Sequence, residues 1–499
     1  MPAMPLDDDK RRDSKREDAH YDDLTALSPE LDRELRKLEH MFTVDAAKLK
    51  EVSLQFEHEL RQGLSRVSRC LLPSLESEGG NLPMLPTWVL GFPSGHECGE
   101  YLTIDLGGTK LRICWVTLNE GKGENQSDQE IYHIPKDYKV GTADQLWSFL
   151  AESMEDFMTK RHIEPEEGTV IPLGFTFSYP ATQEYIDQGV LQTWTKGFDI
   201  KGVEGHDVAD QLRQALHKRG LPIQIVALIN DTVGAMIASA YSDPKTIMGA
   251  IFGTGCNASY MENCGSIAKL GGLPENLPMA INCEYGAFDN DRRILPRTPY
   301  DKTIDKESPR PGEQTFEKMS AGMYLGEIFR QVLVDLHSRG LLFKNQDPSK
   351  LLTPFIIKTG FLANIEDDAS PSLTSTHAAF TTLLALSPTA AERLFVRRAA
   401  ALVATRGARL CTAGVSAICR KKDISAGHVA ADPLVYNNAR FKARWAQAMA
   451  EVFDWDEARD EDPIVMTAAA DGSGLGAAVI SAMTLERVAR GDATGLRPE

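Results

Sequence analysis

The stretch DLGGTK contains residue types that could bind a phosphate group. Asp105, Gly107, Gly108 and Thr109 lie between two apolar runs, with Lys110 at the rim. Glycines permit positive φ and let backbone N–H groups approach an anion, and threonine adds a hydroxyl donor. An aspartate repels phosphate unless a cation lies between them, so Asp105 indicates Mg²⁺ held through water. A plain hairpin turn with a solvated aspartate fits the same residues, and the stretch alone does not separate the two interpretations.

Two further glycine-rich turns could also bind phosphate or nucleotide. The first, in IFGTGCNASY, contains Gly253, Thr254 and Gly255. The second, ADGSGLG, places Gly472, Ser473 and Gly474 directly before a predicted helix. A helix N-terminus carries partial positive charge, which favours an anion there. Small-residue turns before helices are common, so the spacing by itself predicts little.

The segment ALINDTVG places an amide and a carboxylate, Asn230 and Asp231, at the end of a buried apolar run. A carboxylate in that position is costly unless it is paired or functional. Open α/β sheets bind their ligands at this edge. We therefore expect Asp231 to be functional, with a structural turn aspartate as the alternative.

Other polar residues could bind a polyhydroxyl ligand. Amides and carboxylates accept and donate the hydrogen bonds that sugar hydroxyls need, and Asn257, Glu284 and Glu317 supply such groups beside Asn230 and Asp231. The stretch LGFTFSYPATQ…LQTWTKGFDI adds Ser178, Thr195 and Lys196. Its aromatic residues, among them Phe175, Phe177, Tyr179 and Trp194, are expected in the core rather than at the ligand.

The elements that must position these residues follow an α/β pattern. Helices are expected at 29–42, capped by Ser28, and at 44–64. From residue 101, apolar strand-like runs alternate with helical stretches, which predicts a buried sheet. Further helices are expected at 144–160, 206–219, 316–338, 376–421 and 441–453. The layout of 101–115 recurs at 248–262, which predicts duplicated halves facing each other across a cleft.

Composition limits the classes of function. With 42% hydrophobic residues, the 499-residue chain is typical of a globular protein, and no apolar run approaches the roughly 18 residues of a membrane span. Residues 1–27 predict a disordered charged tail, whose basic patch allows a nuclear or docking signal as the alternative. A net charge of −17 argues against nucleic acid as the main partner. Eight cysteines without a C-x-x-C pair predict buried free thiols and a cytoplasmic location.

Taken in order, these motifs resemble those of eukaryotic hexokinases of the fungal type, over residues 30–490. The resemblance implies an α/β protein with the two-lobed, actin-like ATPase (ribonuclease H-like) fold, in which duplicated halves surround a central cleft. We expect an N-terminal half over 28–235, with a helical lead-in and a small lobe carrying the sugar signature. A C-terminal half over 236–490 would form the large, nucleotide-side lobe, and 491–499 a short tail.

The resemblance also implies ligands and roles. The protein would transfer a phosphoryl group from ATP to the C6 hydroxyl of glucose or a related hexose, in the first step of glycolysis, as a monomer or homodimer. Asp231 would be the general base, and Lys196 would help neutralise the transferred group. The sugar pocket would contain Ser178, Thr195, Lys196, Asn230, Asp231, Asn257, Glu284 and Glu317. The nucleotide site would contain Asp105, close to Mg²⁺, with Gly107, Gly108, Thr109, Lys110, Gly253, Thr254, Gly255, Gly472, Ser473 and Gly474.

Four sites depart from the family's usual pattern. Lys110 replaces Asn, Ala235 replaces Thr, Ala470 replaces Glu, and Pro433 with Leu434 replaces Gly and a hydroxyl residue. Proline lacks an N–H donor, so the last change removes nucleotide contacts. All four lie on the nucleotide side. They support an alternative, a catalytically weak or inactive hexokinase-like glucose sensor, and location at the mitochondrial surface or in the nucleus stays open beside the cytoplasm.

Overall fold

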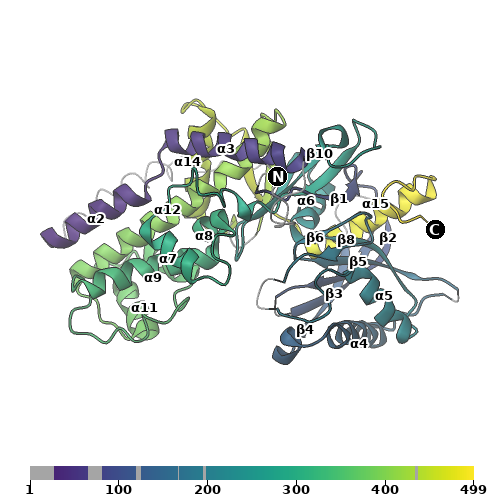
Figure 1. The fold of residues 1–499 in the computed structure, drawn as a ribbon, viewed down its shortest axis with the longest axis horizontal. Coiled ribbons are helices and arrows are strands. Elements are labelled where there is room, and N and C mark those ends of the chain that lie inside the picture. Colours follow the sequence, from purple (N-terminus) through teal and green to yellow (C-terminus); the bar gives the residue numbers. More distant parts are fainter. Residues whose placement is uncertain are drawn as a thin grey trace, which may run out of the picture.

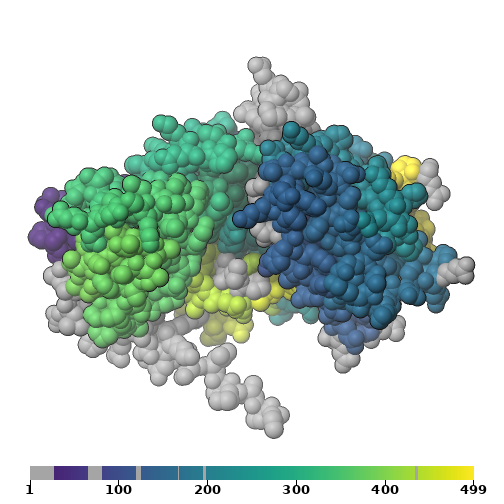
Figure 2. Space-filling model, turned by 90° about the horizontal axis from the view of Figure 1, so that it is seen from below, coloured from purple at the N-terminus to yellow at the C-terminus, as the bar shows by residue number. Residues whose placement is uncertain are grey.

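The computed structural model describes residues 27–65, 81–108, 110–119, 125–166, 168–194, 198–432 and 436–498. These residues form two lobes that lie side by side (Figure 1). The space-filling view shows a hollow between the lobe coloured green and the lobe coloured blue (Figure 2). Of the predicted tail over 1–27, residues 1–26 lie outside the described residues.

The small lobe is built on a sheet with the strand order β4-β3-β2-β5-β8. Its strands are β2 (Gly99–Leu106), β3 (Lys110–Leu118), β4 (Gln126–His133), β5 (Ile171–Phe177) and β8 (Ile223–Ile229). The first three strands are antiparallel, whereas β2, β5 and β8 run parallel. The parallel strands are apolar on both faces because helices cover both sides, as in other α/β sheets. A short pair, β6 (Ala181–Thr182) and β7 (Val190–Leu191), forms a separate small sheet.

The large lobe repeats this topology. Its sheet has the order β1-β11-β10-β9-β12-β13. The strands are β1 (Leu85–Leu90), β9 (Thr246–Ile251), β10 (Asn257–Asn263), β11 (Pro278–Asn282), β12 (Gly427–Ala431) and β13 (Ile464–Ala468). β9, β10 and β11 are antiparallel, and β9, β12 and β13 are parallel. Apart from the added edge strand β1, the two sheets therefore match strand for strand, as the recurring sequence layout predicts.

The helices also correspond between the halves. The first half contains α4 (Ala143–Arg161), α5 (Val208–Lys218) and α6 (Asp231–Ser242), and the second contains α12 (Ala390–Lys421), α14 (Ala439–Phe453) and α15 (Ala477–Ala489). α6 packs on β9 and β10 of the large sheet, while α15 packs on β2, β5 and β8 of the small sheet. Each half therefore ends in a helix that crosses to the other half. The sequence-based boundary after residue 235 falls inside α6 and stays a prediction.

The remaining helices enlarge the large lobe. They are α2 (Pro29–Phe42), α3 (Ala46–Ser65), α7 (Pro299–Glu307), α8 (Thr315–Ser320), α9 (Gly322–Ser338), α10 (Thr359–Glu366) and α11 (Thr374–Leu384). α2 and α3 pack on α12, so the helical lead-in lies against the large lobe although its sequence precedes the small one. Ser28 caps α2 by accepting a hydrogen bond from the Leu31 N–H, as predicted.

Two long predicted helices are interrupted. The stretch 316–338 breaks at Ala321, whose backbone is extended, and the next N–H, of Gly322, donates to Gly253 O at 2.7 Å. The stretch 376–421 breaks between α11 and α12, where Ala385 has a φ of 57° and Pro388 precedes the Thr389 cap. The first break depends on a hydrogen bond to a distant turn, and the second on local backbone conformation and a new helix cap. Neither is visible in the apolar pattern of the sequence.

Six of the seven described cysteines are buried, and none of these seven forms a disulfide. Cys98 is exposed, contrary to prediction, and Cys70 lies outside the described residues.

The segment 491–498 lies against the small lobe, where the Gly495 carbonyl accepts a hydrogen bond from the Ile186 N–H at 2.9 Å. Within the described part of the chain, no helix is long and apolar enough to cross a membrane.

Candidate active site

The predicted base lies where β8 gives way to α6. Asn230 is the N-cap, and its side-chain oxygen accepts hydrogen bonds from the Thr232 N–H at 2.9 Å and the Thr232 hydroxyl at 2.6 Å. Asp231 is the first residue of the helix, and its Oδ1 accepts from the Thr232 N–H at 2.8 Å. Among the described residues no cation pairs with Asp231, and its Oδ2 accepts no hydrogen bond. The helix N-terminus thus holds a carboxylate with one oxygen available for a ligand proton.

Three side chains of the large lobe form a hydrogen-bonded cluster. Asn257 Nδ2 donates to Asn282 Oδ1 at 2.8 Å and to Glu284 Oε1 at 3.4 Å. Asn282 Nδ2 donates to the same Glu284 oxygen at 2.9 Å. Glu284 has a φ of 49°, a left-handed conformation that is uncommon outside glycine and often marks a functional site. These contacts fix the orientation of each amide before any ligand arrives.

Glu317 reaches the same region from α8. Its Oε2 accepts a hydrogen bond from the Cys256 N–H at 3.1 Å, directly before Asn257. A Cβ added at Gly255 would lie 2.9 Å from this oxygen, so a larger residue there would displace the Glu317 carboxylate. The second glycine turn therefore packs directly against this carboxylate.

Asn282 was not predicted from the sequence. It lies at the end of β11, two residues before Glu284, and its side chain is buried. The signal that could have identified it is its place at a strand end beside a predicted carboxylate. Asn282 and Asn230 line one narrow pocket between the lobes, together with Phe177, Tyr179 and Gln183. This pocket brings the Asn230 cap and the large-lobe cluster together.

Ser178 directly follows β5 and is buried at the same edge of the small sheet. Thr195 and Lys196 lie outside the described residues. The residues on either side, Trp194 and Phe198, stack at 5.1 Å between ring centroids, and the Trp194 N–H donates to Glu204 at 2.6 Å. Phe177, Tyr179 and Trp194 are buried in the small-lobe core, as predicted, but Phe177 and Tyr179 also line the pocket between the lobes, which was not predicted.

The first glycine turn is a tight β2–β3 hairpin. The Gly107 N–H donates to Lys110 O at 3.0 Å, and Lys110 itself is exposed. Thr109 lies outside the described residues. Glycine permits positive φ, but Gly107, Gly253 and Gly255 do not adopt it. The space around Gly107 and Gly253 is open, since a Cβ at either position would meet no atom closer than 3.4 Å. A phosphate could approach the backbone at these two positions.

The third glycine turn closes on α6. Gly472 begins a π-helical turn (Gly472–Gly476), and a Cβ at Gly472 or Gly476 would collide with the backbone of Gly234 or Ala235. These glycines thus permit the two crossing helices to touch. Ser473 O accepts a hydrogen bond from the Thr176 hydroxyl at 3.2 Å, and the Gly474 N–H donates to Asp471 at 3.1 Å. The predicted contact of Gly472–Gly474 with the nucleotide stays a prediction.

Two arginines that sequence reasoning missed link the lobes. Arg112 on β3 donates to both oxygens of Asp471, at 3.0 and 2.5 Å, and its guanidinium lies 4.0 Å from Asp105. Burial alone would lower the pKa of Arg112, but the hydrogen bonds and charge of Asp471 raise it overall. Arg310 of the large lobe donates to Trp194 O at 2.9 Å and to the Thr193 hydroxyl.

Two of the described residues that depart from the family pattern, Ala235 and Ala470, are accommodated without an evident defect in packing or hydrogen bonding. Ala235 is buried in α6, and the Ala470 N–H donates to the Ser239 hydroxyl at 3.0 Å. Pro433 and Leu434 lie outside the described residues, so the predicted loss of nucleotide contacts there stays a prediction.

No group of three or more His, Cys, Asp or Glu side chains suited to enclosing a metal occurs within the described ranges. Mg²⁺ is often held by one carboxylate together with substrate phosphates and water, and Asp105 at the end of β2 fits that arrangement.

The fold is that of a two-lobed sugar kinase, and comparison with known proteins gives the family. Two hexokinase family models match residues 34–241 and 247–483. The chain is 51% identical to the hexokinase of Emericella nidulans, covering 93% of each chain. It is 46% identical to Hexokinase-1 of Saccharomyces cerevisiae, covering 97% of this chain and 98% of the relative. A solved hexokinase of Schistosoma mansoni in complex with glucose superposes with a TM-score of 0.81 at 32% identity, over 91% of this chain and 99% of that one. The chain belongs to the hexokinase family.

Proposed function

We propose that this protein is an ATP-dependent hexokinase that transfers the γ-phosphoryl group of ATP to the C6 hydroxyl of glucose or a related hexose. The observation that supports it most is the pocket between the two lobes. It is lined by Asn230, which precedes Asp231 in the chain, and by Asn282, which donates a hydrogen bond to Glu284. Family membership over nearly the full chain supports the same reaction. The Schistosoma relative, whose structure contains glucose, supports glucose as a substrate.

In this proposal the large-lobe cluster binds sugar hydroxyls. Asn257 and Asn282 both donate to Glu284, which holds three polar side chains in one place, where hydroxyl groups can donate and accept. Glu317 is held by the Cys256 N–H and adds a second carboxylate. A site with buried polar groups rejects ligands that cannot satisfy them. Ser178, Thr195 and Asn230 complete the sugar pocket.

Asp231 acts as the general base. Its available oxygen takes the proton of the C6 hydroxyl. The C6 oxygen bonds to the γ-phosphorus, and the bond from phosphorus to the ADP oxygen breaks. A positioned base contributes on the order of 10²–10⁴ in rate. Lys196 neutralises charge on the transferred group, and the backbone at Gly107–Lys110 and Gly253–Gly255 holds the phosphates. Mg²⁺, when bound with the nucleotide near Asp105, supplies further charge neutralisation.

Closure of the lobes would exclude water from the transferred group. Arg112 and Arg310 already join the two lobes. Arg112 contacts Asp471, which precedes Gly472, and Arg310 contacts Trp194, which precedes Thr195.

We place the enzyme in the cytosol, as a monomer or homodimer, and the buried free thiols support a reducing compartment.

The test is turnover by the purified full chain with glucose and Mg-ATP. We expect glucose 6-phosphate, and Asp231→Asn should lower kcat by about 10²–10⁴ while glucose still raises the melting temperature. Asp144→Asn, at an exposed aspartate on α4, is the matched control and should keep the wild-type rate. Near-wild-type turnover of D231N would exclude Asp231 as the base.

The same assay decides the alternative. A glucose sensor would bind glucose and form no product at millimolar ATP. Among the described residues, no observation favours this alternative.

A further inference from the structure

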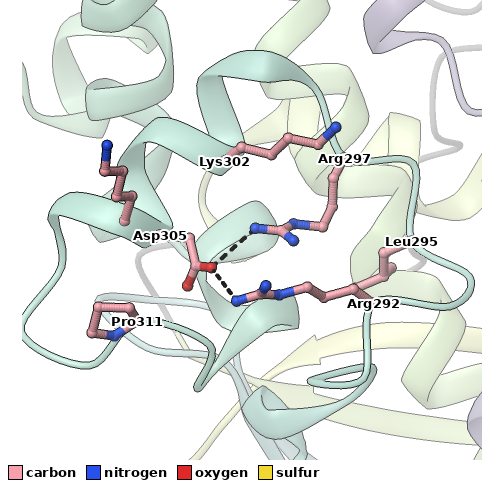
Figure 3. Close-up of a pocket in the computed structure, with 7 residues that line it drawn as sticks. Arg292, Leu295, Arg297, Lys302, Asp305 and Pro311 are labelled. Atoms are coloured by element: carbon pink, nitrogen blue, oxygen red, sulfur yellow. Dashed lines mark hydrogen bonds and ion pairs between the residues drawn. The ribbon is translucent and has the colours of Figure 1, made fainter.

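A second cavity lies in the large lobe, outside the proposed active site. It has a volume of about 680 Å³, within the usual range for small-molecule sites. α7 forms one wall and the segment 292–297 another (Figure 3). The lining residues are Arg292, Leu295, Arg297, Lys302, Asp305, Lys306 and Pro311. None of them has a role in the proposed reaction.

The lining carries an excess of positive charge. Four of its side chains are cationic and only Asp305 is anionic. Asp305 Oδ1 already accepts from the buried Lys318 ammonium at 2.8 Å and from the Gly312 N–H at 2.9 Å. The negative charge of Asp305 is balanced by the Lys318 ammonium, so it does not also neutralise the charges of Arg292 and Arg297. In a chain with a net charge of −17, this is a local positive site.

The two arginines keep donors available. Both guanidinium groups point at Asp305 (Figure 3), with Arg292 donating at 2.9 Å and Arg297 at 3.1 Å. Asp305 is the only side-chain partner of either group within the described residues, although each guanidinium has five N–H donors. The Arg297 side chain is 10% exposed. The donors of Arg297 that Asp305 does not use are accessible to solvent rather than buried without a partner.

The two lysines have no comparable structural explanation. Lys302 and Lys306 lie one turn apart on α7 and are exposed. Neither ammonium pairs with a side chain among the described residues. Neighbouring carboxylates have other partners, since Asp301 is held by the Arg406 guanidinium at 2.7 Å and Asp291 pairs with Arg293 at 3.2 Å. A purely structural role of the Asp305 cluster would explain the arginines and leave these lysines unexplained.

We propose that this cavity binds a small phosphate-bearing molecule. Guanidinium forks match the oxygens of a phosphate, and the two lysines add point charges that suit a dianion. The volume exceeds that of a phosphate group alone, and Leu295 and Pro311 give an apolar surface for an attached organic part. The source of the phosphate is either an ester such as a sugar phosphate or free inorganic phosphate.

Isothermal titration calorimetry on the full chain tests the proposal. The proposed active site is first saturated with glucose and a non-hydrolysable ATP analogue, and ionic strength is held constant with NaCl. Glucose 6-phosphate and inorganic phosphate are then titrated separately. Tighter binding of the ester would identify an organic phosphate as the ligand, and equal affinity would identify the phosphate group itself.

The variant K302Q/K306Q should weaken binding by about tenfold or more, through the loss of charge-assisted contacts. The control K344Q/K350Q removes the same charge from exposed lysines elsewhere on the large lobe and should bind like the wild type. Both variants change surface residues only, and equal melting temperatures would show that the fold is intact. Equal affinity and stoichiometry in wild type and K302Q/K306Q, or no wild-type heat above the NaCl control, would overturn the proposal.

Discussion

The proposed sugar side and the proposed nucleotide side of the cleft are built by different means. On the sugar side, side chains bond to one another in a fixed cluster, with Asn257, Asn282 and Glu284 at its centre. On the nucleotide side, glycine turns expose backbone, and one ion pair between Arg112 and Asp471 joins the lobes. The sugar side should therefore be sensitive to single side-chain changes, whereas the nucleotide side should tolerate them.

The strongest test of this difference is Asn282→Ala. It removes one hydrogen bond from Glu284 and one from the Asn257 amide, and a buried polar group that loses its partner costs about 1–3 kcal/mol. We expect kcat/KM for glucose to fall by about 10- to 100-fold, with little change in the KM for ATP. Steady-state kinetics against both substrates measures this, with the exposed Asn263→Ala as control. An equal rise in both KM values would contradict a role confined to the sugar.

A second test concerns the packing behind the sugar side. Glu59 of α3 is buried near Asp289, and burial raises the pKa of its carboxyl to about 7. The folded state holds this proton between about pH 4.5 and 7, where the unfolded chain has released it. Stability should therefore fall as pH rises through that window. Glu59→Gln should remove this contribution and gain about 3 kcal/mol relative to wild type at pH 8.

Urea unfolding of both proteins at pH 5 and pH 8 measures the difference. The exposed Glu51→Gln, on the same helix, is the control. Parallel pH profiles for E59Q and wild type would show that Glu59 does not titrate in this window.

On the nucleotide side, Arg112→Gln removes the bidentate contact with Asp471. Because the pair is partly exposed, we expect only a three- to tenfold rise in the KM for ATP, roughly 1 kcal/mol, and an unchanged KM for glucose. Arg440→Gln, from an exposed ion pair with Asp367, is the control. A larger loss that includes glucose affinity would mean that this ion pair holds the lobes together for both substrates.

The smallest effect is expected for Lys110→Asn, which restores the family's usual residue at the hairpin rim. Lys110 is exposed, so the KM for ATP should change by no more than about twofold. Initial rates at varied ATP concentration measure it. A tenfold change would show that side chains, and not only backbone, determine nucleotide binding at this turn.

Much of the fold could be predicted from the sequence, because hydrophobic periodicity and caps act over a few residues. The strand runs, the Ser28 cap and the repeated layout of 101–115 and 248–262 all belong to this class. The helix break at Ala321 could not be predicted in the same way. It depends on the hydrogen bond from the Gly322 N–H to the Gly253 carbonyl, which belongs to a turn far earlier in the chain.

The sequence by itself determined the residue types of the site and the family, since the motif order survives without coordinates. Tertiary structure alone decided which side chains meet. Asn282 joins Asn257 and Glu284 in one hydrogen-bonded cluster. Arg112 and Arg310 join the lobes, and Gly472 packs against α6. These contacts link residues from distant segments, and their geometry depends on how the crossing helices α6 and α15 set the two sheets against each other.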